Sequence, residues 1–338
     1  METTGPSTDI KIIALIGAMK SGTTSLAKLL SVSPDLTLAD RKEPGYFSRD
    51  ERWRKGWSWY RTQFSGYQKG KLLLDASTCY SRSTRYPHAA QRLAIVNPDA
   101  RVIYLLRHPV DRAISHYYHE MIRRFARGET LEPIHEFLSH DTECISTSFY
   151  DRELQIWRDY FPQNAIFLMR FEELVQAPIA VTNQLLRNLT LRQISDCDGV
   201  IHRGMSHANQ SVDSALKICS GMIEEKLLTS IPGRLMRATL SPLRILNLRE
   251  VLRNGAMRWG LSHRLYLKFL QQVDYPTDEL VLWLHEILDP HTERLEGMTG
   301  WDLSSWYARH YSSYSYYLSD ASDSSLSTYP STTRNASL

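Results

Sequence analysis

A short apolar run near the N-terminus, followed by a turn of small residues, most constrains how this chain can fold. Residues 10–17 read IKIIALIG, and the next residues read AMKSGTTS before the helical pattern SLAKLLSV of residues 25–32. In such a strand–turn–helix unit, successive backbone N–H groups and the helix N-terminus form a cradle for an anion. The spacing G-x-x-x-x-G is that of a nucleotide-binding loop, but Thr23 stands where a lysine would follow the second glycine. That lysine reaches the β- and γ-phosphates in nucleotide triphosphatases, so this loop predicts a phosphate site without the equipment to cleave a triphosphate.

Short apolar runs alternate with longer amphipathic runs along most of the chain. The predicted strands are 10–17, 71–76, 101–107 and 165–170, and the predicted helices are 25–32, 86–98, 110–125, 148–162, most of 171–189, and 276–300. Strands of continuous apolar character, separated by helical segments, indicate a parallel sheet covered on both faces. We therefore expect a three-layer α/β fold of the P-loop type, with a central parallel sheet and helices on both faces.

The remaining segments set the predicted domain boundaries. Residues 1–9 are polar and are predicted to be a loose leader, and residues 10–310 are predicted to form a single domain. Within that domain, 200–275 is less regular and rich in Arg and Leu, which suggests a helical insertion or lid. Residues 311–338 are dominated by Ser, Tyr and Thr. Such weakly apolar tracts cannot offset their ordering entropy, so this tail is predicted to be disordered.

Charge and apolar content exclude several classes of function. With 40 Lys or Arg against 37 Asp or Glu, the net charge of +3 does not suggest nucleic-acid binding, so an anionic ligand requires locally gathered charge. No apolar run approaches the roughly 20 residues of a membrane span or the pattern of a signal peptide, which predicts a cytoplasmic protein without a transmembrane segment. The four cysteines show no C-x-x-C spacing and are interpreted as isolated reduced thiols.

The loop and its flanks resemble the sulfotransferases that use 3′-phosphoadenosine 5′-phosphosulfate (PAPS). In that family the first strand leads into a loop of the type K-[SA]-G-T-[ST], and IIALIGAMKSGTTSLAKLLSVSPDL is similar to this element throughout. The resemblance implies that Lys20 reaches the oxygen bridging phosphate and sulfate, where charge builds as the bond breaks. It also implies that the 5′-phosphosulfate is held by Lys20, Ser21, Gly22, Thr23, Thr24 and Ser25. The alternative is a glycine-containing strand–helix turn with an exposed lysine.

A second predicted anion site follows the third predicted strand. Arg107 ends that strand and Ser115 follows in the next helix, in the stretch RHPVDRAISHYY. A guanidinium offers a bidentate fork to a phosphate. By resemblance, Arg107 and Ser115 bind the 3′-phosphate that distinguishes PAPS from ADP or ATP, and Arg203-Gly204 corresponds to a later loop around the same phosphate. The alternative is an arginine capping a strand and a serine packed in a helix.

The predicted catalytic base lies in RKEPGYF, residues 41–47, which is similar to the K-E-x-x-[YF]-F segment of heparan-type and many bacterial sulfotransferases. The resemblance assigns Glu43 as the base, which must sit within hydrogen-bond reach of the acceptor hydroxyl. The alternative is a Lys–Glu pair on a surface loop. The aromatic stretch 55–64 and residues 148–162, with Tyr150 pointing inward, also resemble family elements that line the cleft. Plain core packing is the competing interpretation of both.

One departure from the family pattern falls after the second predicted strand. Heparan-type enzymes carry Glu-Lys-[ST]-Pro there, whereas this chain reads Asp75-Ala76-Ser77-Thr78, so Lys20 is expected to carry more of the charge stabilisation. His116-x-x-His119-Glu120 matches no metal motif and is interpreted as a solvated or core-edge histidine pair.

The sequence thus predicts a PAPS-dependent sulfotransferase that requires no metal. Its acceptor is predicted to be a hydroxyl, or an amine, of a small molecule or carbohydrate. Two alternatives stay open: an ATP-dependent P-loop kinase with Asp75 as a Walker B acid, and a catalytically inactive nucleotide-binding or interaction module.

Overall fold

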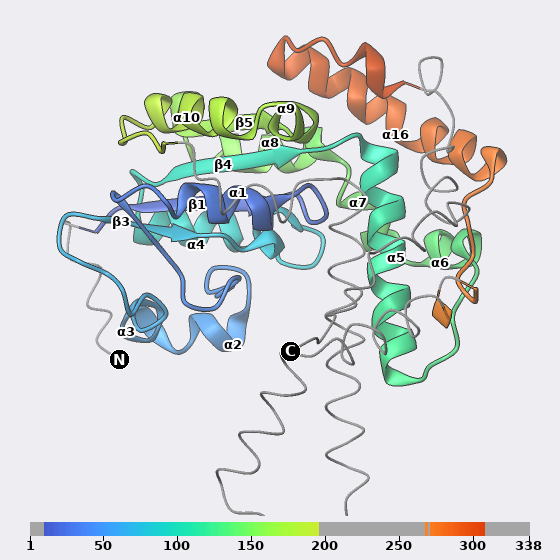
Figure 1. Cartoon of the computed structure of the whole chain (residues 1–338), viewed down its shortest axis with the longest axis horizontal. Helices are drawn as coiled ribbons and strands as arrows, with labels where there is room; N and C mark the ends of the chain where they lie inside the picture. The colour runs from blue at the N-terminus through green and yellow to red at the C-terminus, as the bar shows by residue number, and fades with distance from the viewer. Residues whose placement is uncertain (1–9, 196–267, 270, 308–338) are drawn as a thin grey trace, which may run out of the picture.

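A central parallel sheet organises the chain in a computed structural model that describes residues 10–195, 268–269 and 271–307 (Figure 1). The five strands of this part are β1 (Ile12–Gly17), β2 (Leu36–Leu38), β3 (Leu72–Asp75), β4 (Arg101–Leu106) and β5 (Ile166–Arg170). They are all parallel and lie in the order β2-β3-β1-β4-β5. The predicted leader, Arg203, most of the 200–275 segment and the predicted tail lie outside the described residues.

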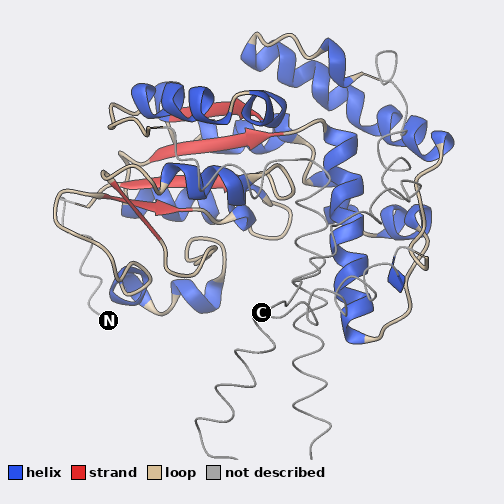
Figure 2. Ribbon diagram, viewed as in Figure 1, coloured by secondary structure: helices blue, strands red, loops and turns tan. Residues whose placement is uncertain are grey.

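Helices cover both faces of the sheet, as Figure 2 shows. Successive side chains of a strand point to opposite faces. Accordingly, Ile13 and Leu15 of β1 pack with the helices α1 (Thr23–Leu30), α9 (Phe171–Gln176) and α10 (Pro178–Asn188). Ile12 and Ile16 pack on the other side, with α4 (Ala89–Val96) and α8 (Tyr150–Arg158). This is the predicted three-layer α/β arrangement, and β1 is buried along its whole length because both of its faces and both of its edges are covered.

All four predicted strands are present, and the sequence prediction missed the fifth. Strand β2 is only three residues long and reads LTL, which is too short for an apolar run to stand out. The helical stretch predicted at 171–189 is divided between α9 and α10 at Pro178, a residue whose ring and missing N–H are tolerated at the start of a helix. Four further short helices were not predicted: α2 (Asp50–Trp53), α3 (Gly56–Arg61), α6 (Ile134–His140) and α7 (Thr142–Ser146).

Two long helices complete the described part. Helix α5 (Pro109–Arg127) stands across the edge toward which the strands point (Figure 1), and α16 (Asp278–Thr299) packs on α5 and α8. The side chain of Thr277 caps the N-terminus of α16 by accepting from the N–H of Leu280 at 3.2 Å. No helix within the described ranges has the length and apolar character needed to cross a membrane.

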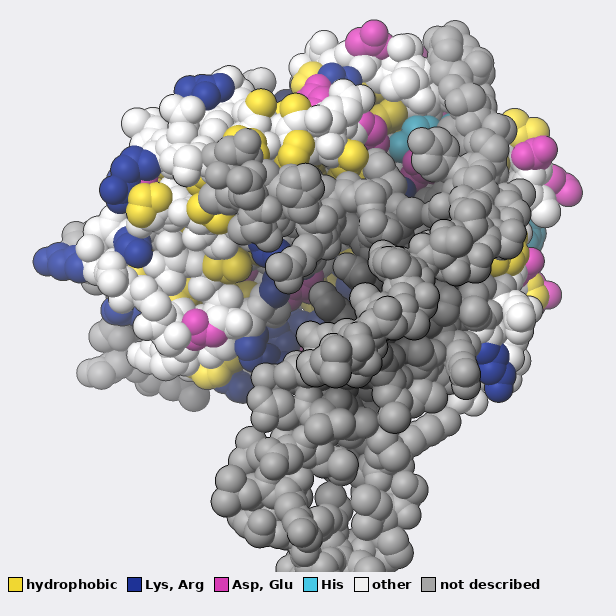
Figure 3. Space-filling model, viewed as in Figure 1, with side chains coloured by type: hydrophobic (Ala, Val, Ile, Leu, Met, Phe, Trp, Pro, Cys, Tyr) yellow, Lys and Arg dark blue, Asp and Glu magenta, His cyan; other side chains and the backbone are white. Residues whose placement is uncertain are grey.

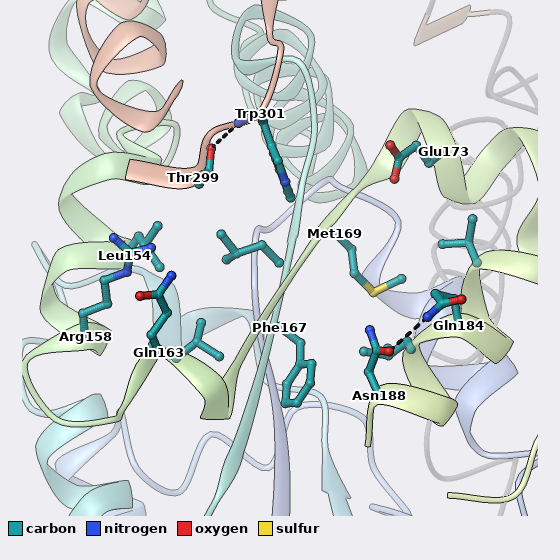
Figure 4. A pocket seen from close by; sticks show the side chains of 14 residues that line it. Leu154, Arg158, Gln163, Phe167, Met169, Glu173, Gln184, Asn188, Thr299 and Trp301 are labelled. Atoms are coloured by element: carbon teal, nitrogen blue, oxygen red, sulfur yellow. Dashed lines mark hydrogen bonds between the residues drawn. The ribbon is translucent and has the colours of Figure 1, made fainter. Parts of the chain in front are cut away.

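A pocket of about 420 Å³ lies along the outer edge of β5 (Figure 4). Phe167 and Met169 of β5 line it together with Leu154 of α8 and Trp301. None of the predicted site residues lines this pocket. The predicted site residues lie instead where the strands end.

Candidate functional site

The loop between β1 and α1 folds tightly at the carboxyl end of the sheet. The N–H of Ala18 donates to the carbonyl of Leu105 in β4 at 2.7 Å, and the N–H of Ser21 donates to the carbonyl of Ala18 at 3.1 Å. Lys20 has φ 72° and Gly22 has φ 82°, so the chain passes twice through the left-handed region before α1 begins. No side chain caps the N-terminus of α1. The N–H of Ser25 donates to the carbonyl of Gly22 at 3.0 Å, which leaves the N–H groups of Thr23 and Thr24 available to an anion.

The position of Gly22 requires glycine because a side chain has no room there and because its backbone is left-handed. A Cβ at this position would lie 2.6 Å from Cε2 of Phe171, the first residue of α9. The ring of Phe171 in turn lies under the guanidinium of Arg107, with 5.1 Å between Cζ and the ring centroid. Phe171 therefore joins the loop to the arginine that follows β4. The sequence analysis did not single it out, because an aromatic residue after a strand carries no signal of its own.

Arg107 lies directly against the predicted phosphate loop. Its Nη1 donates to the carbonyl of Lys20 at 3.2 Å. The backbone carbonyl of Arg107 accepts from the hydroxyl of Tyr150 at 2.8 Å. Tyr150 points inward, as predicted, and is 2% exposed. Ser115, the other residue of the predicted 3′-phosphate site, lies within the second turn of α5 and is 7% exposed.

The ammonium group of Lys20 lies among other positive charges. Burial, followed by the charges of Arg107, Lys42 and Arg112, lowers the pKa of Lys20 from 10.5 to about 8, and Glu120 opposes this shift. Among the described residues, no carboxylate lies within salt-bridge distance of Lys20. An ammonium in such surroundings is suited to an anion, because a bound negative charge would offset both its desolvation and the repulsion of its neighbours.

Arg112 is a further cationic group near Lys20, and the sequence analysis did not single it out. Its guanidinium is fully buried and donates to the hydroxyl of Ser148 and the carbonyl of Cys144, and it contacts Nδ1 of His116 at 3.4 Å. None of these partners is a carboxylate. Arg112 thus supplies a fixed positive charge behind the loop.

The histidine pair of α5 belongs to the same positive region. Burial lowers the pKa of His116 well below 6.5, with Arg112 the next cause, and burial followed by Lys20 lowers the pKa of His119 to about 3. Both imidazoles are therefore neutral near pH 7. In the ranges that the structure describes, no group of three or more His, Cys, Asp or Glu is placed to hold a metal ion.

Glu43 lies on a strained loop beside the positive region formed by Lys20, Arg107 and Arg112. Its φ is 67°, and its Oε1 accepts from Nζ of Lys42 and from Oγ1 of Thr78, both at 3.0 Å. The side chain is 40% exposed. Lys42 connects Glu43 with the loop between β1 and α1: it bonds to Glu43, and its charge also lowers the pKa of Lys20 in that loop. The carboxylate of Glu43 is thus positioned at the cationic region while remaining accessible.

The described site residues lie in the segments that follow β1, β4 and β2, and β3 separates β2 from β1 in the sheet. Ser21 and Thr23 are buried, Gly22 and Ser25 are half-buried, and Thr24 is exposed. The aromatic stretch 55–64 contributes Tyr60 to the core, where its ring stacks on Tyr46 with centroids 4.8 Å apart. Arg203 lies outside the described residues, so its predicted role stays a prediction.

A parallel five-stranded sheet with helices on both faces and a glycine turn between β1 and α1 make the described part of this chain a P-loop-like α/β protein. Residues 11–220 match the sulfotransferase domain family, and the chain belongs to that family. This agrees with the family and enzyme class predicted from the sequence and sets the kinase alternative aside.

Curated relatives carry sulfotransferase names, and one solved structure shares the fold. The chain is 24% identical over 173 residues to mouse (Mus musculus) heparan sulfate glucosamine 3-O-sulfotransferase 5, covering 49% of each protein. It is 29% identical over 189 residues to mouse heparan sulfate glucosamine 3-O-sulfotransferase 3B1, covering 53% of this chain and 46% of that relative. The chain therefore spans about half the length of these relatives. A sulfotransferase from Alicyclobacillus acidocaldarius superposes with a TM-score of 0.52 at 21% identity, covering 89% of this chain and 99% of the other, which confirms the predicted fold.

Proposed function

We propose that this protein transfers the sulfuryl group of PAPS to a hydroxyl group of a carbohydrate acceptor. The observation that carries the proposal is the meeting of Lys20 and Arg107 at one anion loop: Arg107 bonds to the backbone of Lys20, and both charges lie at the uncapped N-terminus of α1. Two cationic side chains and the N–H groups of Thr23 and Thr24 suit a ligand with more than one phosphate-like group.

The residues present fit the two ends of PAPS. Lys20 and the N–H groups of the loop would hold the 5′-phosphosulfate, and Arg107 with Ser115 would hold the 3′-phosphate. Arg107 stacks on Phe171 and bonds to the loop carbonyl, which fixes the direction of its planar guanidinium. Such a fixed fork suits a bidentate phosphate contact, whereas a lysine would act there only as a point charge.

The chain then supplies a base and a charge stabiliser for the transfer. Glu43 takes the proton of the acceptor hydroxyl as the acceptor oxygen attacks sulfur. The new O–S bond forms while the bond from sulfur to the bridging phosphate oxygen breaks, and the electron pair stays on the leaving 3′-phosphoadenosine 5′-phosphate (PAP). Lys20 and the loop N–H groups stabilise the charge on that oxygen, because preorganised donors aimed at developing charge lower the barrier.

An anionic carbohydrate is the acceptor class that the surroundings of Glu43 favour. The guanidiniums of Arg49, Arg82 and Arg85 lie 5.6, 5.9 and 5.6 Å from the centroid of the Tyr86 ring. Each also pairs with a carboxylate, Arg49 with Glu51 and both other arginines with Glu143, so the three guanidiniums exceed the two carboxylates by one positive charge. Nη1 of Arg82 also reaches Sδ of Met19 in the anion loop, at 3.9 Å. Figure 3 shows Lys and Arg side chains gathered where the described surface borders the grey segment. The relatives named as heparan sulfate sulfotransferases support the same class.

The nucleotide is tested by thermal unfolding in the presence of PAP or of ATP with Mg²⁺. A ligand that binds only the folded state stabilises it by about 2.7 kcal/mol at one hundred times its Kd. We expect stabilisation by PAP, its loss in Arg107→Ala, and its retention in Arg101→Ala, a matched change at the exposed opposite end of β4. Stabilisation by ATP–Mg²⁺ alone would contradict the proposal, and no response to either nucleotide would favour an inactive module.

The base is tested by measuring PAP release from PAPS with sulfated and desulfated oligosaccharide acceptors. A general base contributes typically 10²–10⁴-fold to the rate, so Glu43→Gln is expected to lower kcat by at least about a hundredfold. The PAP affinity of this variant should equal that of the unmodified protein. A Glu43→Gln variant with undiminished kcat would refute the assignment.

A further inference from the structure

The carboxylate of Asp75, at the end of β3, is completely buried and is held by hydroxyl groups alone. Its Oδ1 accepts from Oγ of Ser77 at 2.6 Å, and its Oδ2 accepts from the hydroxyls of Tyr80 at 2.7 Å and Tyr60 at 3.0 Å. In the described part of the chain, no Lys, Arg or His side chain pairs with it. A buried carboxylate without a cation is costly, and it persists only where its acceptor capacity is used.

Two of these hydroxyls also hold the loop that carries Glu43. The N–H of Gly45 donates to Oγ of Ser77 at 2.9 Å, and the N–H of Phe47 donates to the hydroxyl of Tyr80 at 3.4 Å. The third hydroxyl belongs to Tyr60, whose ring stacks on Tyr46 of the same loop. Asp75 is therefore connected to this loop through three separate side chains.

The direction of these bonds follows from the charge of Asp75. A hydroxyl carries one proton, and an ionised carboxylate can only accept. Ser77 and Tyr80 must therefore give their protons to Asp75, and this leaves their lone pairs directed to the N–H groups of Gly45 and Phe47. An uncharged side chain in place of Asp75 would not impose this orientation.

The loop needs such an anchor because its backbone is strained where the base sits. Glu43 has φ 67°, in the left-handed region that non-glycine residues avoid. In addition to these bonds, Thr78, in the segment that follows β3, donates to Oε1 of Glu43 at 3.0 Å. Arg52 donates to the carbonyl of Glu43, also at 3.0 Å. The segment after β3 thus contacts both the backbone of the loop and the carboxylate itself.

We propose that Asp75 is a positioning residue for Glu43: by orienting Ser77 and Tyr80, it fixes the backbone from which the base projects. This inference rests on the proposed role of Glu43. Asp75 touches neither acceptor nor nucleotide in this scheme, so it acts on the rate of transfer and not on PAP affinity. It also supplies a function for the Asp-Ala-Ser-Thr sequence that departs from the family pattern.

The test is a double-mutant cycle between Asp75→Asn and Glu43→Gln, with kcat, KM and the Kd of PAP measured for each protein. The amide of Asn has one accepting oxygen in place of two, so either Ser77 or both Tyr60 and Tyr80 lose their acceptor. We expect Asp75→Asn alone to lower kcat by tenfold or more with the Kd of PAP unchanged, and to cause no further loss in the Glu43→Gln background. Such non-additivity identifies residues that act through one another.

Other outcomes separate this inference from the proposed function. An equal fold-loss in both backgrounds, an unchanged kcat, or a weakened PAP affinity would overturn the role of Asp75. Full activity of Glu43→Gln would instead refute the base assignment, and with it this inference. If Asp75→Asn does not fold, the cycle is repeated with Ser77→Ala, which removes only the hydroxyl that lies between Asp75 and Gly45. Ser83→Ala is the control, because Ser83 bonds to Glu153 and not to the loop of Glu43.

Discussion

The lowered pKa of Lys20 predicts how nucleotide binding depends on pH. The lysine must carry its charge to bind a phosphosulfate, and in the free protein that charge is lost as the pH rises through about 8. A bound anion favours the charged form, so the pKa of Lys20 rises in the complex. The affinity for PAP is therefore nearly constant between about pH 7 and 7.5 and falls as the pH increases above 8.

The size of the effect follows from the two pKa values of Lys20. With a pKa of about 8, only about 3% of free protein molecules carry the charge at pH 9.5, so the Kd for PAP should rise roughly thirtyfold between pH 7 and 9.5 if the pKa in the complex exceeds 10. With the ordinary value of 10.5, the Kd would change by only about 10%. The second phosphate pKa is near 6, so the ligand itself does not titrate in this range.

Titration calorimetry of PAP binding at half-unit pH steps distinguishes these cases. Lys20→Arg keeps its charge throughout the range and should give a Kd that hardly varies with pH. Lys28→Arg, an exposed position of α1, should retain the dependence of the unmodified protein. A pH-independent Kd in the unmodified protein, or an unaltered slope in Lys20→Arg, would refute the reasoning.

Two stability predictions follow from other contacts. Gly22→Ala places a Cβ against Phe171 in the left-handed region and should cost about 2 kcal/mol and abolish PAP binding, whereas Gly70→Ala meets no atom within 4 Å and should lose stability while binding PAP normally. Chemical unfolding with and without PAP measures both, and normal PAP binding by Gly22→Ala would contradict the steric argument. Asp151 accepts two hydrogen bonds from α16, both at 2.6 Å; burial opposes their effect, but together they hold its pKa below the ordinary value. Asp151→Asn should therefore lower the free energy of unfolding by about 2 kcal/mol at pH 7. The difference between the two proteins should shrink as the pH falls below about 4 and through the pKa of Asp151 in the folded state, and urea unfolding at pH 7 and below pH 4 measures it.

The local elements of the nucleotide loop could be predicted because their signals lie within a few consecutive residues. The apolar run ending at Gly17 predicts a buried strand, and the pattern of residues 25–32 predicts a helix, which in the structure begins two residues earlier, at Thr23. Both are present in the structure. Strand β2 could not be predicted, because three residues with one threonine in the middle carry too little periodicity.

Four of the five described strands, the glycine loop that carries Lys20 and the likeness to sulfotransferases could be read from consecutive residues, whereas β2 and four short helices could not. Which distant side chains meet is seen only in the folded chain. The pKa of Lys20 depends on Arg107, Lys42 and Arg112, which come from separate segments, and the anchor at Asp75 joins the end of β3 to the loop of Glu43. The physical reason is range: backbone preference is set by neighbouring residues, whereas desolvation, charge–charge coupling and the direction of a hydroxyl proton depend on which distant side chains are buried together.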